Sequence, residues 1–144
     1  MQSSRFIEQL RRNSVALISL AIAIASLSYN SWRNELSEDN RTQRTVSIEV
    51  LRNLSDLQEL VWHNHYDRDT QDKGNLRSGW AIVITTRDIA TILNAPLPES
   101  AAMLYDTWSK NNEELGKDDA AKDAIIEAIE KCRSNTLNLL QELR

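Results

Sequence analysis

The stretch Asn13–Trp32, NSVALISLAIAIASLSYNSW, contains no charged residue, although 26% of the residues in the whole chain of 144 are charged. Twenty residues of α-helix span about 30 Å, which is the thickness of the hydrocarbon core of a bilayer. Its serines are tolerated in lipid because each can donate its hydroxyl to a backbone carbonyl one turn earlier. The stretch therefore predicts one transmembrane helix. The residues that would anchor it are Val15, Leu17, Ile18, Leu20, Ile22, Ile24, Leu27, Tyr29 and Trp32.

The residues at the two edges of this stretch are typical of a membrane interface. Tyr29 and Trp32 place aromatic rings at one edge, where such rings are enriched. Both flanks carry three arginines, so the charge rule for orientation is nearly balanced, and the free amino terminus adds one positive charge on the first side. We expect the amino terminus in the cytoplasm and the remainder outside, which in a bacterium means the periplasmic side of the inner membrane. The flanking arginines are Arg5, Arg11 and Arg12 on one side and Arg33, Arg41 and Arg44 on the other.

Two other interpretations of the apolar stretch remain open. In the first, it is a cleaved signal peptide with Val15–Ala25 as its apolar core and Ala23-Ile24-Ala25 as its cleavage site. The apolar pattern continues past Ala25 without a turn-forming Gly or Pro, which favours an anchor over a signal. In the second, the stretch is a buried helix of a soluble protein, although no face of it is polar enough to meet water.

The rest of the chain, from Arg33 on, is acidic. It holds 14 basic and 20 acidic residues, a net charge of −6, whereas the whole chain has −4. Phosphates would repel such a body, and an anionic membrane surface would not attract it. Composition therefore disfavours nucleic acid as a partner. The one cysteine, Cys132, can form no disulfide within the chain, and its apolar helical surroundings predict a buried thiol rather than a reactive one.

The absence of helix breakers predicts a long first helix. The first glycine is Gly74 and the first proline is Pro96, so one helix can run from about Ser4 to about His63, roughly 90 Å. The segment Ser37–Thr45 has no apolar residue. It is either a solvated helical stalk or a break after which Asn40 caps a new helix.

Beyond the stalk the pattern is that of an amphipathic helix. Apolar residues recur at intervals of three and four, which suits a helical bundle or a short coiled coil. These residues are Val46, Val50, Leu54, Leu57 and Val61. We divide the chain into a basic amino-terminal tail (1–12), a transmembrane helix (13–32), a polar stalk (33–45) and a helical bundle domain (46–144).

Three further helices are expected after a loop at residues 67–75. The first runs from Gly79 to about Leu93 with Ser78 as its cap, and it should be largely buried. The second runs from Pro98 to about Leu115, with Gly116 at its carboxyl end. The third opens with Asp118 and Asp119 and has the clearest helical spacing in the chain.

The predicted fold is all-α: an amino-terminal transmembrane helix continuing into a long helix, then an antiparallel bundle of about four helices. The core residues expected are Val50, Leu54, Leu57, Val61, Trp80, Ile84, Tyr105, Trp108, Ile125, Ile129 and Leu140.

The stretch Trp62–Asp69, WHNHYDRD, holds both histidines of the chain. On a helix His63 and His65 point some 200° apart and cannot share an ion, but on an extended segment they can. Asp67 and Asp69 continue that alternation, so His63, His65, Asp67 and Asp69 are candidate metal ligands if the segment is extended. The preferred interpretation is the end of a helix followed by a solvated loop, where a histidine favours the negative end of the helix dipole.

The sequence contains no Gly-rich phosphate loop, no nucleophile elbow and no cysteine pair. We therefore predict no cofactor, no catalytic residue and no enzymatic activity. A hydrolase that uses a histidine as its base would lack a visible nucleophile.

Several short motifs carry a resemblance to a known group of proteins. The segments LISLAIAIASLSYNSWRNE, NRTQRT, ELVWHNHYD and LGKD resemble an uncharacterised family of small proteobacterial proteins. The resemblance covers most of the chain and implies a single amino-terminal membrane anchor with a helical body. It carries over no catalytic or binding residue.

These observations lead to two expectations for function. The first is a single-pass, membrane-anchored helical module that tethers, scaffolds or assists a protein partner or a second copy of itself. The second is a ligand or metal sensor that uses the four candidate residues between His63 and Asp69.

Overall fold

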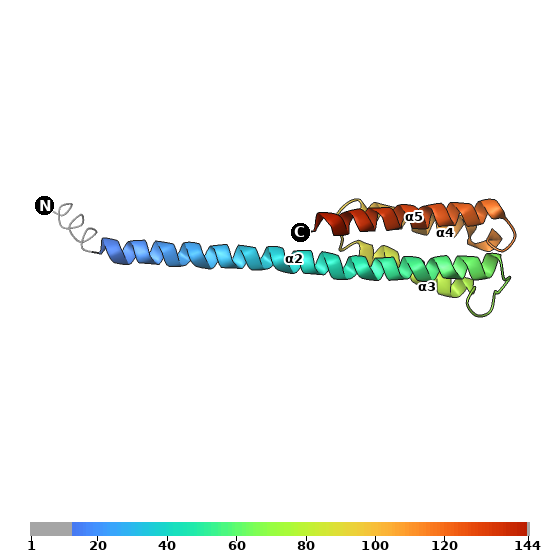
Figure 1. Ribbon diagram of the computed structural model, residues 1–144, viewed down its shortest axis with the longest axis horizontal. Coiled ribbons are helices and arrows are strands. Elements are labelled where there is room, and N and C mark those ends of the chain that lie inside the picture. The colour runs from blue at the N-terminus through green and yellow to red at the C-terminus, as the bar shows by residue number, and fades with distance from the viewer. Residues whose placement is uncertain (1–12, 144) are drawn as a thin grey trace. The chain divides into compact units, whose positions relative to one another are not determined.

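The computed structural model describes residues 13–143 of the chain, and this part is all-helical, without strands. Its first helix, α2, spans Ser14–His65, and three shorter α-helices and a 3₁₀ turn follow it (Figure 1). The described chain divides into two units, the first ending at Asp39 and the second beginning at Asn40. The predicted helix start at Ser4 and the basic tail 1–12 lie outside the described residues.

The helix α2 passes through the polar segment Ser37–Thr45 without a break. No proline or glycine interrupts it, and Thr45 returns its hydroxyl to the carbonyl of Arg41 at 2.9 Å. Asn40 therefore lies within the helix and does not cap a new one.

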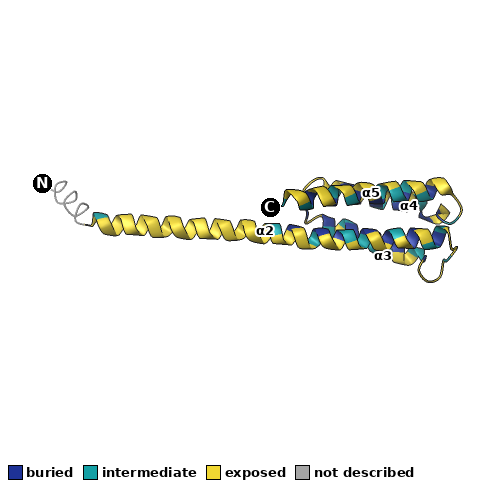
Figure 2. Ribbon diagram, viewed as in Figure 1, coloured by how far each residue is buried: buried dark blue, intermediate teal, exposed yellow. Residues whose placement is uncertain are grey.

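In the second unit, one face of α2 is buried with a strict repeat of four and three residues, which is the seam of a coiled-coil-like bundle. Figure 2 shows this buried face on the carboxyl-terminal half of α2. The seam begins earlier than the apolar stripe suggested, because two polar residues open it. Its members are Gln43, Ser47, Val50, Leu54, Leu57, Val61 and Asn64.

The polar start of this seam has a structural cause. Gln43, only 3% exposed, donates its amide to the carbonyl of Ile92 at 3.0 Å and accepts from the N–H of Asn94 at 3.1 Å. It thereby satisfies backbone groups beyond the end of the next helix, which have no partner within that helix. The stalk predicted for 33–45 thus ends within the bundle rather than before it.

The helix α3 spans Leu76–Ala90, and its cap is Asn75. The Asn75 side chain accepts from the N–H of Arg77 at 2.9 Å. The prediction that Ser78 caps this helix is wrong, because Ser78 already lies in the first turn. Both residue types are good caps, so sequence preference alone does not separate them.

The face of α3 that is buried also differs from the prediction. Gly79, Val83, Thr86 and Ala90 are buried, with spacing of four, three and four. Ile84 lies one residue off this face and is 39% exposed, so its assignment to the core is wrong. The helix is therefore amphipathic rather than largely buried.

The helix α4 spans Leu97–Asn111, with Pro98 and Glu99 in its first turn as expected. It packs closely against both α3 and α5. A Cβ atom added to Gly79 would lie 2.3 Å from the indole of Trp108, so the missing side chain makes room for that ring. Trp80 packs edge-on against Tyr105 and Trp108, with ring centroids 5.7 and 6.5 Å apart.

The chain leaves α4 through a 3₁₀ turn, η1, at Asn112–Glu114, and enters α5 at Asp119–Glu142. Gly116 does not have the positive φ of a left-handed cap, so its assigned role as a helix cap is wrong. Asp118 caps α5 by accepting from the N–H of Ala120 at 2.9 Å. The spacing predicted for this helix is confirmed by its buried residues, Ala121, Ile125, Ile129, Cys132, Thr136 and Leu139.

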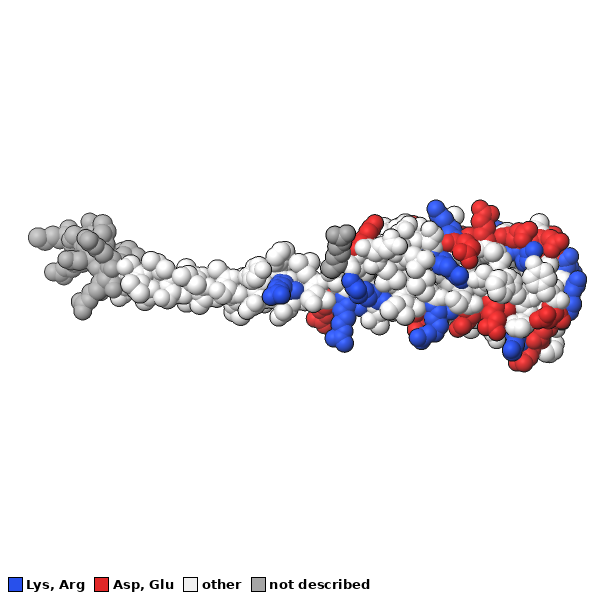
Figure 3. Space-filling view, in the orientation of Figure 1, with Lys and Arg blue, Asp and Glu red and all other residues white. Residues whose placement is uncertain are grey.

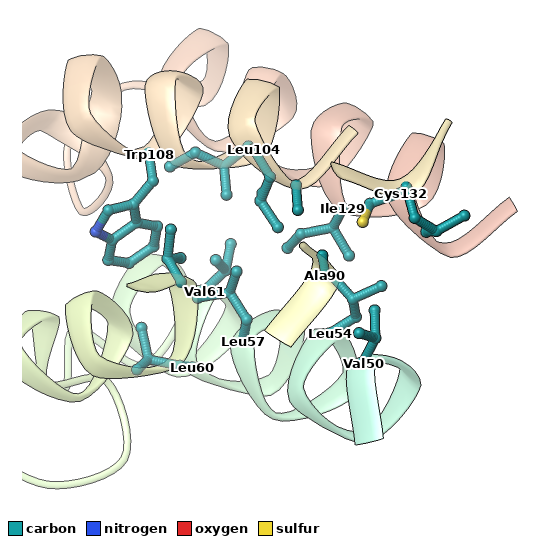
Figure 4. Close-up of a cluster of buried hydrophobic side chains, with 14 of the residues drawn as sticks. Val50, Leu54, Leu57, Leu60, Val61, Ala90, Leu104, Trp108, Ile129 and Cys132 are labelled. Atoms are coloured by element: carbon teal, nitrogen blue, oxygen red, sulfur yellow. The ribbon is translucent and has the colours of Figure 1, made fainter. Parts of the chain in front are cut away.

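Successive helices of the second unit run antiparallel and enclose one core (Figure 1). Figure 4 shows side chains of α2 meeting Leu104 and Trp108 of α4 and Ile129 and Cys132 of α5. Seven of the predicted core residues are fully buried, with 0% exposure: Val50, Leu54, Leu57, Val61, Trp108, Ile125 and Ile129. Trp80, Tyr105 and Leu140 are half-buried.

Candidate functional site

The apolar part of α2 exposes its side chains in the first unit. Within the described residues, α2 is the one helix long and apolar enough to cross a membrane, and none of its most apolar window is buried. Every predicted anchor residue is exposed, from 47% for Leu17 to 75% for Val15. Figure 3 shows no charged side chain on the visible face of this stretch, whereas acidic and basic residues cover the bundle. Such a continuous apolar surface is uncommon on a protein that meets only water.

Two local features of this surface match its predicted chemistry. Ser19 donates its hydroxyl to the carbonyl of Val15 at 2.8 Å, so this serine leaves no unpaired hydroxyl donor on the apolar surface. Tyr29 and Trp32 lie one turn apart with ring centroids separated by 6.2 Å. They form a small aromatic group at the end of the uncharged stretch, the position that interfacial aromatics occupy.

The exposure of the stretch bears on the competing interpretations. A core helix of a soluble protein would be buried by its neighbours, and none of this window is. The exposure of this window therefore favours a membrane-spanning helix over a core helix. A signal sequence would have the same length and composition, but α2 continues without a break past the candidate cleavage residues Ala23-Ile24-Ala25.

The histidines lie in the last turn of α2, so the segment that carries them is helical and not extended. The ring of His63 is flanked along the helix by two carboxylates. Its Nδ1 lies 2.6 Å from Asp67 Oδ2 and its Nε2 lies 3.4 Å from Glu59 Oε1. These are contacts within one helix end, at positions four residues before and after the histidine.

His65 makes contacts with a different part of the bundle. Its Nδ1 lies 2.6 Å from the carbonyl oxygen of Leu115, and its Nε2 lies 3.0 Å from Asp119 Oδ1. The side chain is 11% exposed. His65 thus joins the end of α2 to the connection between η1 and α5.

Asp69 organises the loop that follows α2. Its carboxylate accepts from the N–H groups of Gln71, Asp72 and Lys73 at 2.9–3.0 Å. The bonds from Asp72 and Gln71 are the main reason that the pKa of Asp69 lies below its ordinary value. This carboxylate therefore holds a turn of its own loop.

Gly74 closes the same loop against α2. A Cβ atom there would lie 1.9 Å from the carbonyl oxygen of Asp69 and 2.7 Å from the backbone nitrogen of Asn64. The buried Asn64 donates its amide to the carbonyl of Gly74 at 2.7 Å. Close approach of two backbones explains why glycine occupies this position.

The four candidate metal ligands are not brought together. No group of three or more His, Cys, Asp or Glu side chains suited to a metal ion occurs in residues 13–143. His63 pairs with Asp67, His65 turns to Asp119, and Asp69 binds loop amides. The extended arrangement that a shared metal would need is replaced by a helix end, where the two rings point apart.

Sequence reasoning missed the residues that complete this region. Asp119 and Lys122 of α5 lie beside His65 and Tyr66: Lys122 Nζ is 3.5 Å from Asp119 Oδ1 and 3.4 Å from the Tyr66 hydroxyl. A hydrogen bond with Asp123 is the largest cause that raises the pKa of Lys122. The only sequence signal was the cluster of acidic residues at the start of α5, which marks any helix start.

Cys132 is fully buried, as its helical pattern predicted. Loss of hydration raises the pKa of the thiol to about 11, against a smaller opposite effect of its hydrogen bond with Thr136. A thiol that stays protonated at neutral pH is a poor nucleophile.

Comparison with protein families, with curated proteins and with solved structures found no match to this chain.

Proposed function

We propose that the chain is a single-pass, membrane-anchored helical module that acts by contact, as a tether, scaffold or accessory subunit of a membrane complex, and not as an enzyme. The observation that carries this proposal is the uncharged stretch of α2, whose apolar side chains are all exposed, whereas the bundle encloses an apolar core of its own. The bilayer is the partner that such a surface fits. Exposing apolar surface to water costs about 25 cal/mol of free energy for each Å².

The polar groups near the end of α2 support a structural role for that region. Each ring nitrogen of His63 and His65 faces an oxygen of the chain itself. A general base needs a ring nitrogen that is free to reach a substrate. These contacts therefore support a structural role for the two histidines rather than a catalytic one.

The proposed location of the protein rests on features of its sequence. We place the anchor in a bacterial inner membrane, with the amino terminus in the cytoplasm and the bundle in the periplasm. The amino-terminal flank has three arginines and the charge of the free amino group, against three arginines on the other flank, which supports this orientation. The resemblance to small proteobacterial proteins supports a bacterial membrane. Protease added to intact spheroplasts would digest the bundle if it lies outside, and would leave it intact if it lies in the cytoplasm.

The contact role is tested by crosslinking in intact cells, followed by purification from detergent extracts. The full chain is compared with a variant in which Leu20→Arg and Ile22→Arg remove the membrane affinity. The proposal expects a defined crosslinked species, with a partner or a second copy, that the anchored chain forms and the variant forms at least tenfold less. A chain that is membrane-bound yet yields only monomer would refute the contact role.

A further inference from the structure

Both ring nitrogens of His65 face oxygen atoms of distant residues. A carbonyl oxygen and a carboxylate oxygen can only accept hydrogen bonds, and they face the two ring nitrogens at 2.6 and 3.0 Å. A neutral imidazole carries one N–H, so one of these contacts would then place two lone pairs against each other. Only the doubly protonated ring donates at both nitrogens.

The groups around the ring are consistent with a positive charge there. His65 is the last residue of α2, and the carboxyl end of a helix favours a cation. Asp119 supplies a carboxylate from α5, and Tyr66 presents its ring at 89° to the imidazole, 4.9 Å away.

Two other cations lie near these groups. Lys122 also contacts Asp119, but its shortest ion pair is with Asp123, at 3.0 Å. Arg68 donates to the carbonyl of Gly116, next to the carbonyl that His65 uses. The side chains of His65 and Arg68 thus hold the chain between η1 and α5 to the end of α2. Of these two residue types, only histidine can change its charge near neutral pH.

We infer that His65 is a pH-sensitive clasp that holds the start of α5 against the end of α2 when its imidazole carries two protons and releases it when one is lost. The closed state binds one more proton than the open state. By linkage, the free energy of opening therefore falls as pH rises through the range in which histidine titrates. The clasp is closed on the acidic side and weakened on the alkaline side.

The test is amide hydrogen exchange on the full chain in detergent micelles between pH 5.5 and 8.5, corrected for intrinsic exchange. The reporters are the N–H groups of Ala120 and Lys122, which bond to Asp118 at the start of α5. We expect their protection to fall on the order of tenfold across this range, equivalent to about 1.4 kcal/mol of opening free energy. In His65→Gln, which does not titrate, the fall should be less than twofold.

Two variants complete the design. His63→Gln makes the same substitution two residues earlier and should keep the fall of the unaltered chain. Asp119→Asn offers an amide that can donate to Nε2 of a neutral ring, so it should abolish the fall and serves if His65→Gln does not fold. A fall that persists unchanged in His65→Gln or in Asp119→Asn, or its absence from the unaltered chain, overturns the clasp.

Discussion

Replacing Gly79 with alanine tests the packing of α3 against α4. The added Cβ would lie 2.3 and 2.4 Å from two atoms of the Trp108 ring, distances at which something must move. Trp108 is 0% exposed, so either its ring must shift within the core or the two helices must separate. Overpacking of this kind costs about 1–3 kcal/mol, and the short contacts indicate the upper end. Alanine recovers about 1 kcal/mol in helix propensity, which leaves a net loss of about 2 kcal/mol.

The assay is thermal and chemical unfolding of the full chain followed by far-ultraviolet circular dichroism. A loss of 2 kcal/mol corresponds to a fall in Tm of about 8 °C for a bundle of this size. Trp108→Phe removes the part of the ring that is in the way, so the double variant should lose at least 1 kcal/mol less than the two single losses combined. Ser78→Ala, one residue earlier and exposed, is the matched control. If Gly79→Ala is as stable as the unaltered chain, or more so, Gly79 does not pack closely against Trp108.

Three further predictions concern the cap, the thiol and the loop. Asn75→Ala should destabilise the bundle by about 1 kcal/mol in chemical unfolding, whereas Ser78→Ala should not, because only Asn75 caps α3; equal losses would restore Ser78 as the cap. Cys132, with its pKa raised to about 11, should react with a thiol reagent at pH 8 only as fast as the bundle unfolds, and stoichiometric labelling of the folded chain within minutes would contradict its burial. The pKa of Asp69 lies below its ordinary value of 3.8. The stabilisation of the loop by its carboxylate is therefore complete above pH 3.8 and is lost as the pH falls below that value. Protection of the Lys73 amide should thus differ between the unaltered chain and Asp69→Ala at pH 6 and converge towards pH 2, and a difference that does not depend on pH would refute this.

The helices and part of the core are predictable from the sequence because their apolar residues repeat with the period of the helix. The intervals in α5 identify its buried face, and the same holds for Val50, Leu54, Leu57 and Val61 in α2. These residues are buried because they are apolar, so their apolar character and their helical spacing together predict the buried face.

Other core positions are set by contacts between distant residues. Gln43 is polar and lies in a polar segment, and it is buried because it bonds to backbone groups 49 and 51 residues away. Gly79 is buried because it packs against the Trp108 ring, and the buried face of α3 that includes Gly79 leaves Ile84 outside it. No local pattern contains either requirement.

The region around the histidines shows the same division. That His63 and His65 end a helix is predictable, because the amphipathic stripe leads directly to them. That His65 turns to Leu115 and Asp119 depends on how α5 returns along α2, because these two residues are 50 and 54 positions further along the chain. The anchor is the opposite case, since its length and composition are read directly from Asn13–Trp32.

Alkaline carbonate extraction of membranes that contain the full chain, combined with the intact mass of the protein, tests the central claim most directly. The account predicts that the unaltered chain stays in the membrane pellet at full mass. Leu20→Arg with Ile22→Arg, which adds about 5–7 kcal/mol against insertion, should move it to the supernatant. The control Glu35→Arg with Ser37→Arg, outside the uncharged stretch, should leave it in the pellet. An unaltered chain recovered in the supernatant, or shortened by removal of its first 25 or so residues, would contradict the account.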